Sequence, residues 1–303
     1  MMMKQSRLHI SFLLVLGGMV LSHLGVVLYK HCCVSENVTV SQQQVSHESS
    51  AKAFGFVPPQ ERQVMCKSVK ELNTLFSQCG FTLAAAKNEG KVPRLFVSKL
   101  PKDMNRGAKK DTFIRALLPH ILQVNEEIMK DRNRLLAMEA RLDAGGHLRS
   151  SEKRWISKLA ADHRCKSTKI KTLLTHVDII PPSLALSQAW IETGKGASSA
   201  ARLKNSTFGY MQSKTQVAKF KDLLTNVRAY MVNLNRHAAY KPFRKIRNEM
   251  RASGKPLDSH KLASGLEKYS IRKAAYIRDI QRMIRSQGLK SYDHITLAGQ
   301  PIR

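Results

Sequence analysis

One carboxylate in the middle of the chain stands where acid chemistry is possible. Glu192 follows an apolar run, residues 184–191, in which Ser187 and Gln188 are the only polar side chains. We predict that this run is a helix that ends at Gly194. Apolar neighbours and the negative end of the helix dipole both disfavour a charged carboxylate, so we expect the pKa of Glu192 to be raised. A carboxylic acid that keeps its proton near neutral pH is what cleavage of a glycosidic bond requires.

A more ordinary interpretation of Glu192 is also open. A glutamate in the last turn of a helix, followed by a glycine cap, is common and has no need of a function. On the functional interpretation, Gly194 and Gly196 lack side chains and would let a bulky polymer approach the acid closely. From residue type alone, the ordinary interpretation of Glu192 is favoured over the functional one.

The elements that must position Glu192 are predicted to be helices. From residue 112 to 142, apolar residues recur every three, four or seven positions, as in a long amphipathic helix. Pro119 lies within this pattern, and Gly145 follows its end. Ser151 is expected to cap the next helix, and Asp222 and Asp258 are expected to cap later ones. Further helical patterns cover about 64–79, 216–235, 241–253 and 259–285, the last divided near Ser270. Strand signals are almost absent, so we predict a mainly α fold.

The N-terminus has the composition of a membrane anchor. Lys4 and Arg7 precede residues 10–29, which contain no Lys, Arg, Asp or Glu. At about 1.5 Å per residue, this run would be roughly 30 Å long as a helix, the thickness of a bilayer core. It is long for a signal peptide, and no clear cleavage site follows it. We therefore expect an uncleaved signal anchor that leaves residues 1–9 in the cytoplasm and exports the rest. A removed signal peptide remains the alternative.

The charge of the chain favours polyanionic partners. Lys and Arg number 51 against 22 Asp and Glu, which gives a formal charge of +29. Nucleic acid, an acidic membrane surface and a polyanionic cell envelope would all suit such a field. Export of the body makes nucleic acid the least favoured of the three. The sequence contains no CxxC pair and no HExxH motif, so we predict neither a metal nor a cofactor. Cys66 and Cys79 could pair in an oxidising compartment.

The segment around Glu192 resembles a known signature. Residues 181–210 read PPSLALSQAWIETGKGASSAARLKNSTFGY. They are similar to the bacterial glucosaminidase domain, glycoside hydrolase family seventy-three, whose pattern includes P-x-S-L-x-L-x-Q-A-x-x-E-[ST]-G-x-G-x-S and a later F-G. Lys195 departs from that family, which usually has Trp there. The similarity extends to the Bax-type proteins of Gram-negative bacteria through four more stretches, residues 92–101, 115–136, 217–240 and 262–284.

This resemblance implies a fold, a reaction and a set of site residues. The fold would be mainly α, within the lysozyme-like α+β superfamily, and the reaction would be hydrolysis of the β-1,4 bond after N-acetylglucosamine in peptidoglycan. Glu192 would be the general acid, and Tyr269 would help to hold substrate or water at the reacting centre. For Tyr269, a core tyrosine with a satisfied hydroxyl is an equally open interpretation. The substrate-binding residues implied are Gln188, Asn205, Phe208, Gly209 and Tyr210.

The chain differs from many members of this family because it lacks their second acid. Many relatives place a β-hairpin or insertion after the Phe-Gly turn, and it supplies a second carboxylate. Only residues 210–221 join the turn to the next helix here, and they contain no acid. A water could then be positioned without a strong base, or the acetamido group of the substrate could assist, as in some exceptions to the two-carboxylate rule. The remaining alternative is a domain that binds glycan without cleaving it.

Together these observations predict one helical domain behind a transmembrane helix. The expected function is a peptidoglycan endo-β-N-acetylglucosaminidase in the bacterial inner membrane, with a single span and its catalytic domain in the periplasm. Its partners would be glycan strands and, through residues 10–29, the inner membrane. The alternative is a non-catalytic, membrane-tethered scaffold that binds peptidoglycan. The expected segments are a cytoplasmic flank 1–9, an anchor 10–29, a stalk with a short helix 30–90, a glucosaminidase domain 91–290 with its catalytic core at 180–290, and a tail 291–303.

Overall fold

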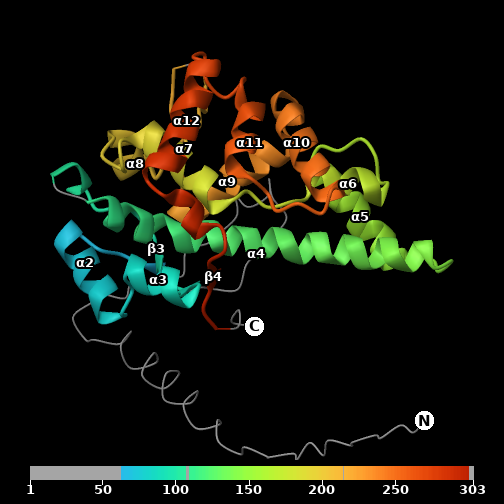
Figure 1. Cartoon of the computed structure of the whole chain (residues 1–303), viewed down its shortest axis with the longest axis horizontal. Helices are drawn as coiled ribbons and strands as arrows, with labels where there is room; N and C mark the ends of the chain where they lie inside the picture. Colours follow the sequence, from blue (N-terminus) through green and yellow to red (C-terminus); the bar gives the residue numbers. More distant parts are fainter. Residues whose placement is uncertain (1–62, 107–108, 214, 300–303) are drawn as a thin grey trace, which may run out of the picture. The chain divides into compact units, whose positions relative to one another are not determined.

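The computed structural model describes residues 63–106, 109–213 and 215–299 (Figure 1). The chain divides into two units, Met1–Val38 and Thr39–Arg303, and all described residues belong to the second. The predicted cytoplasmic flank and membrane anchor, residues 1–29, lie outside the described residues. Within the described ranges, no helix has both the length and the apolar character that a membrane span needs.

The described body is mainly helical, as the sequence predicts. Its α-helices are α2 (Val69–Gln78), α3 (Leu83–Glu89), α4 (Lys110–Asp143), α5 (Ser150–Asp162), α6 (Ile170–His176), α7 (Pro182–Thr193), α8 (Ser199–Lys204), α9 (Leu223–Arg236), α10 (Lys241–Ala252), α11 (Ser259–Ala263) and α12 (Ala274–Ser286). Two short parallel sheets pair β1 (Gln63–Val64) with β3 (Phe96–Val97) and β2 (Lys91–Val92) with β4 (Thr296–Leu297).

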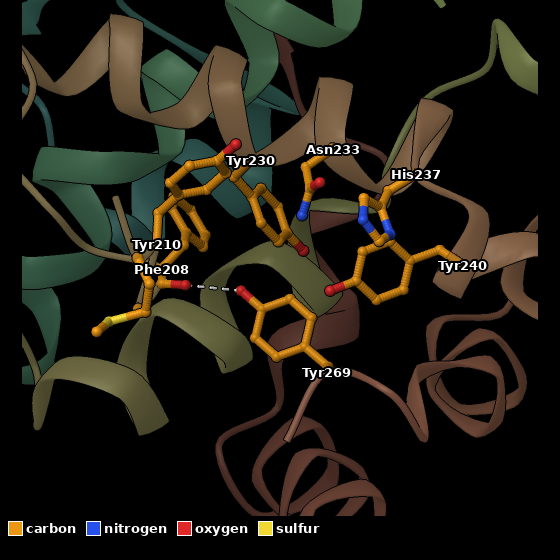
Figure 2. Close-up of a pocket in the computed structure, with 9 residues that line it drawn as sticks. Phe208, Tyr210, Tyr230, Asn233, His237, Tyr240 and Tyr269 are labelled. Carbon is orange, nitrogen blue, oxygen red and sulfur yellow. Dashed lines mark hydrogen bonds between the residues drawn. The ribbon is translucent and has the colours of Figure 1, made fainter. Parts of the chain in front are cut away.

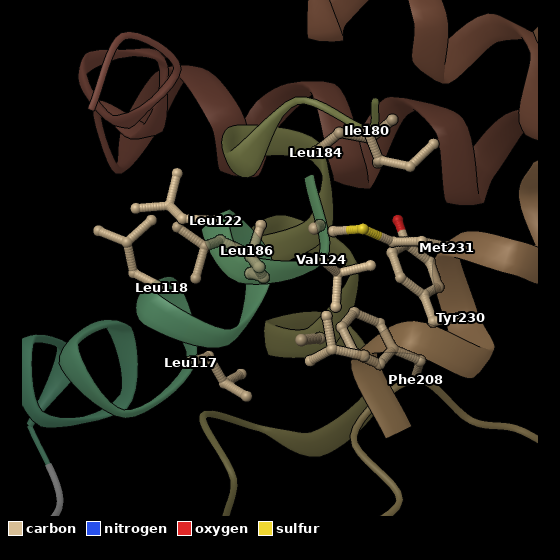
Figure 3. Packing of buried hydrophobic residues seen from close by; sticks show 14 of the residues in the cluster. Leu117, Leu118, Leu122, Val124, Ile180, Leu184, Leu186, Phe208, Tyr230 and Met231 are labelled. Atoms are coloured by element: carbon tan, nitrogen blue, oxygen red, sulfur yellow. The ribbon is translucent and has the colours of Figure 1, made fainter. Parts of the chain in front are cut away.

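The long helix α4 organises the core. It packs against α2, α6, α7 and α9, and in Figure 1 α2 and α3 lie on one side of it while α10, α11 and α12 lie on the other. Figure 3 shows leucines of α4 and α7 packed together with Tyr230 and Met231 of α9. Pro119 lies inside α4, near its start, without ending the helix. Because each fully buried leucine contributes roughly 1.5–3 kcal/mol, this core holds α7 firmly in place.

Helix α7 is apolar because neighbours cover most of it, and only Trp190, Ile191 and Glu192 near its end are partly exposed. Besides α4, it contacts α11, α12 and η5 (Leu289–Tyr292). Leu184, Ala185, Leu186 and Ala189 have no exposed surface. A helix that is hydrophobic all round is typical of such a buried position. The apolar run that precedes Glu192 therefore reflects the central place of α7 in the fold.

Two predicted boundaries differ from the structure. Residues 63–90, assigned to a stalk, belong to the packed body, because Leu72 and Phe76 of α2 are fully buried and β1 pairs with β3. Residues 291–299, assigned to a tail, are also integral, since β4 pairs with β2. In both places, short apolar segments pair with parts of the chain that are distant in sequence. Patterns read within one segment do not reveal such pairing.

Helix boundaries agree with the predictions in part. Asp222 caps α9 by accepting a hydrogen bond from the Thr225 amide at 2.7 Å, so this helix begins later than residue 216. Asp258 caps α11 as predicted, and the chain breaks between η4 (Ser264–Leu266) and α12, on either side of Ser270. Ser151 lies inside α5 and does not cap it. The short helices α3, α6 and α8 were not predicted. No disulfide joins Cys66 and Cys79 among the described residues.

A buried ion cluster anchors the segment that leads into α7. Asp178, which is 2% exposed, pairs with Arg251 at 2.8 Å, with Arg132 at 3.5 Å and with Arg247 at 3.9 Å. Burial raises the pKa of Asp178, but the hydrogen bond from Arg251 and the charges of Arg247 and Arg132 outweigh it and lower that pKa. Arg247 also donates to the side chain of Asn235 at 2.7 Å. The cluster thus ties α4, α9 and α10 to the start of α7.

Replacing Asp178 with Asn is expected to destabilise the chain by about 3–5 kcal/mol, because Arg247 would keep a buried charge without its counter-ion. Urea unfolding of the full chain measures this cost. Asp279→Asn is the matched control, since Asp279 also pairs with two arginines, Arg272 and Arg282, but at the surface. There we expect a loss of less than about 1 kcal/mol. Equal losses for both variants would contradict a structural role for the buried cluster.

Candidate active site

Helix α7 is fixed at both ends, and this determines where Glu192 lies. At the start, the Asp293 carboxylate accepts hydrogen bonds from the Ser183 amide at 2.8 Å and from the Ser183 hydroxyl at 2.7 Å. A carboxylate at this end also suits the positive end of the helix dipole. At the other end, Gly194 adopts φ +57° and caps the helix, as the sequence predicts. Glu192 therefore lies in the last turn of a helix that cannot slide or rotate easily.

The carboxyl group of Glu192 is partly buried, and its pKa is raised. Burial is the main cause, because it disfavours the charged form. A hydrogen bond with the Tyr276 hydroxyl acts in the opposite direction but does not cancel the effect of burial. The predicted direction of the pKa is thus confirmed. A group of this kind can hold a proton at a higher pH than an exposed glutamate can.

The turn at Phe208 and Gly209 lies directly against this carboxyl group. A Cβ atom on Gly209 would approach Glu192 Oε2 to 2.6 Å, and the backbone there has φ +62°. The turn is held by the ring of Phe208, which stacks on Tyr230 at 3.9 Å between centroids. It is also held by the Tyr269 hydroxyl, which donates to the Phe208 carbonyl at 2.8 Å. Phe208, Gly209 and Tyr269, all predicted site residues, are therefore brought together beside Glu192.

A pocket of about 250 Å³ opens beside this turn (Figure 2). Its lining is rich in aromatic rings and hydroxyl groups, contributed by Phe208, Gly209, Tyr210, Met211, Tyr230, Asn233, His237, Tyr240 and Tyr269. Aromatic rings and a few fixed polar groups are typical of ligand sites. The pocket lies next to Glu192 because Gly209 touches both.

His237 is a hydrogen-bond donor toward solvent and is poorly suited to act as a base. Its Nδ1 accepts from the Ala239 amide at 3.1 Å. The neutral ring then carries its proton on Nε2, which leaves no free lone pair there. The His237 side chain, with the Tyr240 hydroxyl and the Asn233 amide, can instead donate to oxygens of a bound molecule.

Sequence reasoning does not identify most of the pocket residues that come from α9 and the segments after it. The family resemblance covers Tyr230, Asn233, His237 and Tyr240 within residues 217–240 but implies no role for them. One signal was present: the chain has seven tyrosines, and those at 210, 230, 240, 269 and 276 surround Glu192 and its pocket. Their concentration between the Phe-Gly turn and α12 indicates a shared site.

Two residues of the predicted substrate-binding set lie outside the pocket lining. Gln188 is fully buried and bonds to Tyr230 and Tyr276, so it lies behind Glu192. Asn205 is 3% exposed and donates to the backbone carbonyls of residues 220 and 221, both at 3.1 Å. These contacts give Asn205 a role in holding the loop that follows α8. Substrate contact by either residue stays a prediction, and it would require a change of conformation from the one seen here.

Comparison with known proteins shows that the pocket lies within a region that matches a family model. The family model described as mannosyl-glycoprotein endo-beta-N-acetylglucosaminidase matches residues 168–289, which include Glu192 and every residue of the pocket. Protein bax of Escherichia coli (strain K12) is 30% identical over 199 residues, which cover 58% of this chain and 71% of that protein. The chain belongs to the Bax-type glucosaminidase-domain family. No solved structure matches the chain significantly. Membership in this family supports a glycosidase-like enzyme that acts in peptidoglycan metabolism.

This Bax-type chain has a small antiparallel pairing where the sequence predicts no hairpin. Met211 and Val217 form an antiparallel bridge, and the Ala218 amide donates to the Tyr210 carbonyl at 2.9 Å. The segments 210–213 and 215–218 thus pair at the rim of the pocket, and Tyr210 packs edge-on against Phe220. Neither segment contains an acid. Across the described ranges, no group of three His, Cys, Asp or Glu side chains is arranged to hold a metal ion.

Proposed function

We propose that this chain is a peptidoglycan hydrolase, an endo-β-N-acetylglucosaminidase that cleaves the β-1,4 bond after N-acetylglucosamine. The observation that carries the proposal is the partly buried carboxyl of Glu192, with its raised pKa, beside an aromatic pocket in the region that matches the family. Glu192 acts as the general acid and protonates the oxygen of the leaving sugar. The pocket residues Phe208, Gly209 and Tyr210 line the path of the glycan, and Tyr269 closes the pocket behind them.

The second half of the reaction must proceed without a second carboxylate in the described pocket lining. Either the acetamido oxygen of the substrate attacks the anomeric carbon, or a water held by pocket hydroxyls does so. The donors Asn233, His237 and Tyr240 are suited to orient an acetamido group or such a water. Assistance by the acetamido group would retain the anomeric configuration, and direct attack by water would invert it. The stereochemistry of the first product therefore distinguishes the two routes.

The position of the enzyme in the cell is part of the proposal. The apolar residues 10–29 anchor the chain in the inner membrane with a single span, and the domain faces peptidoglycan in the periplasm. The net charge of +29 suits a polymer that carries lactyl-peptide carboxylates. Nucleic acid is no partner in this arrangement. Activity of a C-terminal reporter that works only in the cytoplasm would contradict it.

Mass spectrometry of sacculi digested by the purified full chain tests the proposed reaction. We expect soluble muropeptides with N-acetylglucosamine at the new reducing end, because the bond after that sugar is the one cleaved. Reducing-end N-acetylmuramic acid would show that the proposed bond is incorrect. Binding to sacculi without release of reducing ends would instead favour the alternative of a non-catalytic, membrane-tethered scaffold, which the missing second acid motivates.

A further inference from the structure

A chain of buried hydrogen bonds runs behind Glu192. The Tyr230 hydroxyl donates to Gln188 Oε1 at 2.7 Å, and Gln188 Nε2 donates to the Tyr276 hydroxyl oxygen at 3.2 Å. The Tyr276 hydroxyl in turn bonds to the carboxyl of Glu192. Gln188 has no exposed surface, and Tyr230 and Tyr276 are each 2% exposed. Water therefore has little access to the groups that link these three side chains.

In the structure, this chain of bonds runs in one direction, from Tyr230 to Glu192. A tyrosine hydroxyl has one hydrogen to donate, and an amide side chain has one donating end and one accepting end. Because the Tyr276 oxygen accepts from Gln188, its own hydrogen is directed to Glu192. The carboxyl oxygen that faces Tyr276 then acts as an acceptor. When Glu192 is protonated, its proton must lie on the other oxygen.

The aromatic packing couples this chain of bonds to the pocket. Tyr276 stacks on Tyr269 with centroids 5.4 Å apart and rings 7° from parallel. Tyr230 stacks on Phe208 in the same way, at 3.9 Å and 8°. Neither tyrosine ring can rotate without displacing a residue of the pocket lining. The direction of the hydrogen bonds is thereby maintained by the same packing that shapes the pocket.

We propose that Tyr230, Gln188 and Tyr276 form a buried relay of positioning residues that determines which carboxyl oxygen of Glu192 carries the proton. The relay holds the free O–H of the acid away from Tyr276 and available to the substrate. The role of the relay in catalysis rests on the proposed function. Its effect on the protonation of Glu192 is independent of that function. Gln188 is the member that sets the direction, since its amide joins the two hydroxyl groups.

The relay predicts an effect at a distance. Without the Tyr230 hydroxyl, Gln188 Oε1 loses the hydrogen-bond donor that the structure gives it. The amide can then turn over and accept from Tyr276, whose hydrogen is withdrawn from Glu192. Tyr230→Phe is therefore expected to act on Glu192 in the same direction as Tyr276→Phe. A purely structural role for Tyr230 would lower stability without this effect.

Carboxyl ¹³C NMR titration of the full chain, labelled at its glutamates, tests the relay directly. The Glu192 resonance is assigned from its absence in Glu192→Gln. Loss of a hydrogen bond to the charged form should move the Glu192 titration midpoint upward by about one pH unit in Tyr276→Phe, and in the same direction in Tyr230→Phe. The matched control is Tyr292→Phe, which removes a buried hydroxyl of η5 outside the relay. The control should leave the midpoint unchanged.

Activity gives a second, independent readout. A general acid works in its protonated form, so activity falls as the pH rises through its pKa. A higher pKa should therefore shift this alkaline fall of kcat to higher pH in both variants, with KM for glycan unchanged. Unmoved titration midpoints in both variants would overturn the relay, whatever the activity. Shifted midpoints together with full activity of Glu192→Gln would support the relay and overturn the proposed function.

Discussion

Glu192→Gln is expected to lower the release of muropeptides from sacculi by about 10²–10⁴-fold, the range that general acid catalysis contributes. Glutamine keeps the shape of the side chain and a polar contact with Tyr276, but it has no proton to give to a leaving oxygen. The loss should therefore appear in kcat, while binding to sacculi is preserved. Reducing-end analysis of the digest, with a pull-down on intact sacculi, measures the two quantities separately.

The matched control is Glu249→Gln, which removes the charge of an exposed glutamate on α10. Its side chain is 62% exposed and pairs only with Lys245, at 3.8 Å, among the ion pairs of the described residues. We expect activity within about twofold of wild type for this control, because exposed pairs contribute little. Undiminished activity of Glu192→Gln would exclude Glu192 as the acid. The alternative of a non-catalytic scaffold would be supported only if the wild-type chain also released no muropeptides from sacculi.

The pH dependence of the wild-type reaction follows from the burial of Glu192. Burial raises the pKa of its carboxyl, and the Tyr276 hydroxyl moderates this rise. The relay thus has two opposing effects on catalysis: it fixes the geometry of the acid, and it makes the acid somewhat easier to deprotonate. Glu192 can be held in one orientation and still keep its proton, because burial between α7 and α12 raises its pKa by more than the Tyr276 hydroxyl lowers it.

The sequence predicted the parts of the fold that local patterns control. Helix α4 is long and amphipathic, and α7 is a continuous apolar run with a glycine cap, so both were predicted from spacing alone. The family resemblance then drew attention to Glu192, Phe208, Gly209 and Tyr269. The structure brings these four together, since the turn touches the carboxyl and Tyr269 holds the turn.

Features that depend on distant pairing were not predictable in this way. The cap of α7 comes from Asp293, which lies 110 residues after Ser183. The family resemblance assigns Gln188 to substrate binding. Residues four apart lie on the same face of a helix, so Gln188 lies on the face of α7 that carries Glu192, one turn deeper, where it bonds to Tyr230 and Tyr276. The direction in which the Gln188 side chain points depends on how α9 and α12 pack against α7. No spacing within residues 181–210 contains that information.

Gly209→Ala is expected to have the second largest effect, a loss of kcat of about 10²-fold. The added Cβ would lie 2.6 Å from Glu192 Oε2 and 3.2 Å from its carboxyl carbon, so either the acid or the turn must move. Misplacement of a catalytic group by about 1 Å is enough for a loss of this size. Steady-state kinetics on sacculi, with the melting temperature measured in parallel, separates this loss from a general loss of stability.

Gly80→Ala is the control that isolates the contact with Glu192. Gly80 has φ +61°, almost the same as the +62° of Gly209, but a Cβ there would meet nothing within 4 Å. Both substitutions place alanine in the left-handed region, so both should cost about 1–2 kcal/mol of stability. Only Gly209→Ala should also lose activity, because only there does the new methyl group contact the acid. Equal activity of the two variants would mean that the turn does not position the carboxyl of Glu192, and the close approach of turn and acid would then be a feature of packing alone.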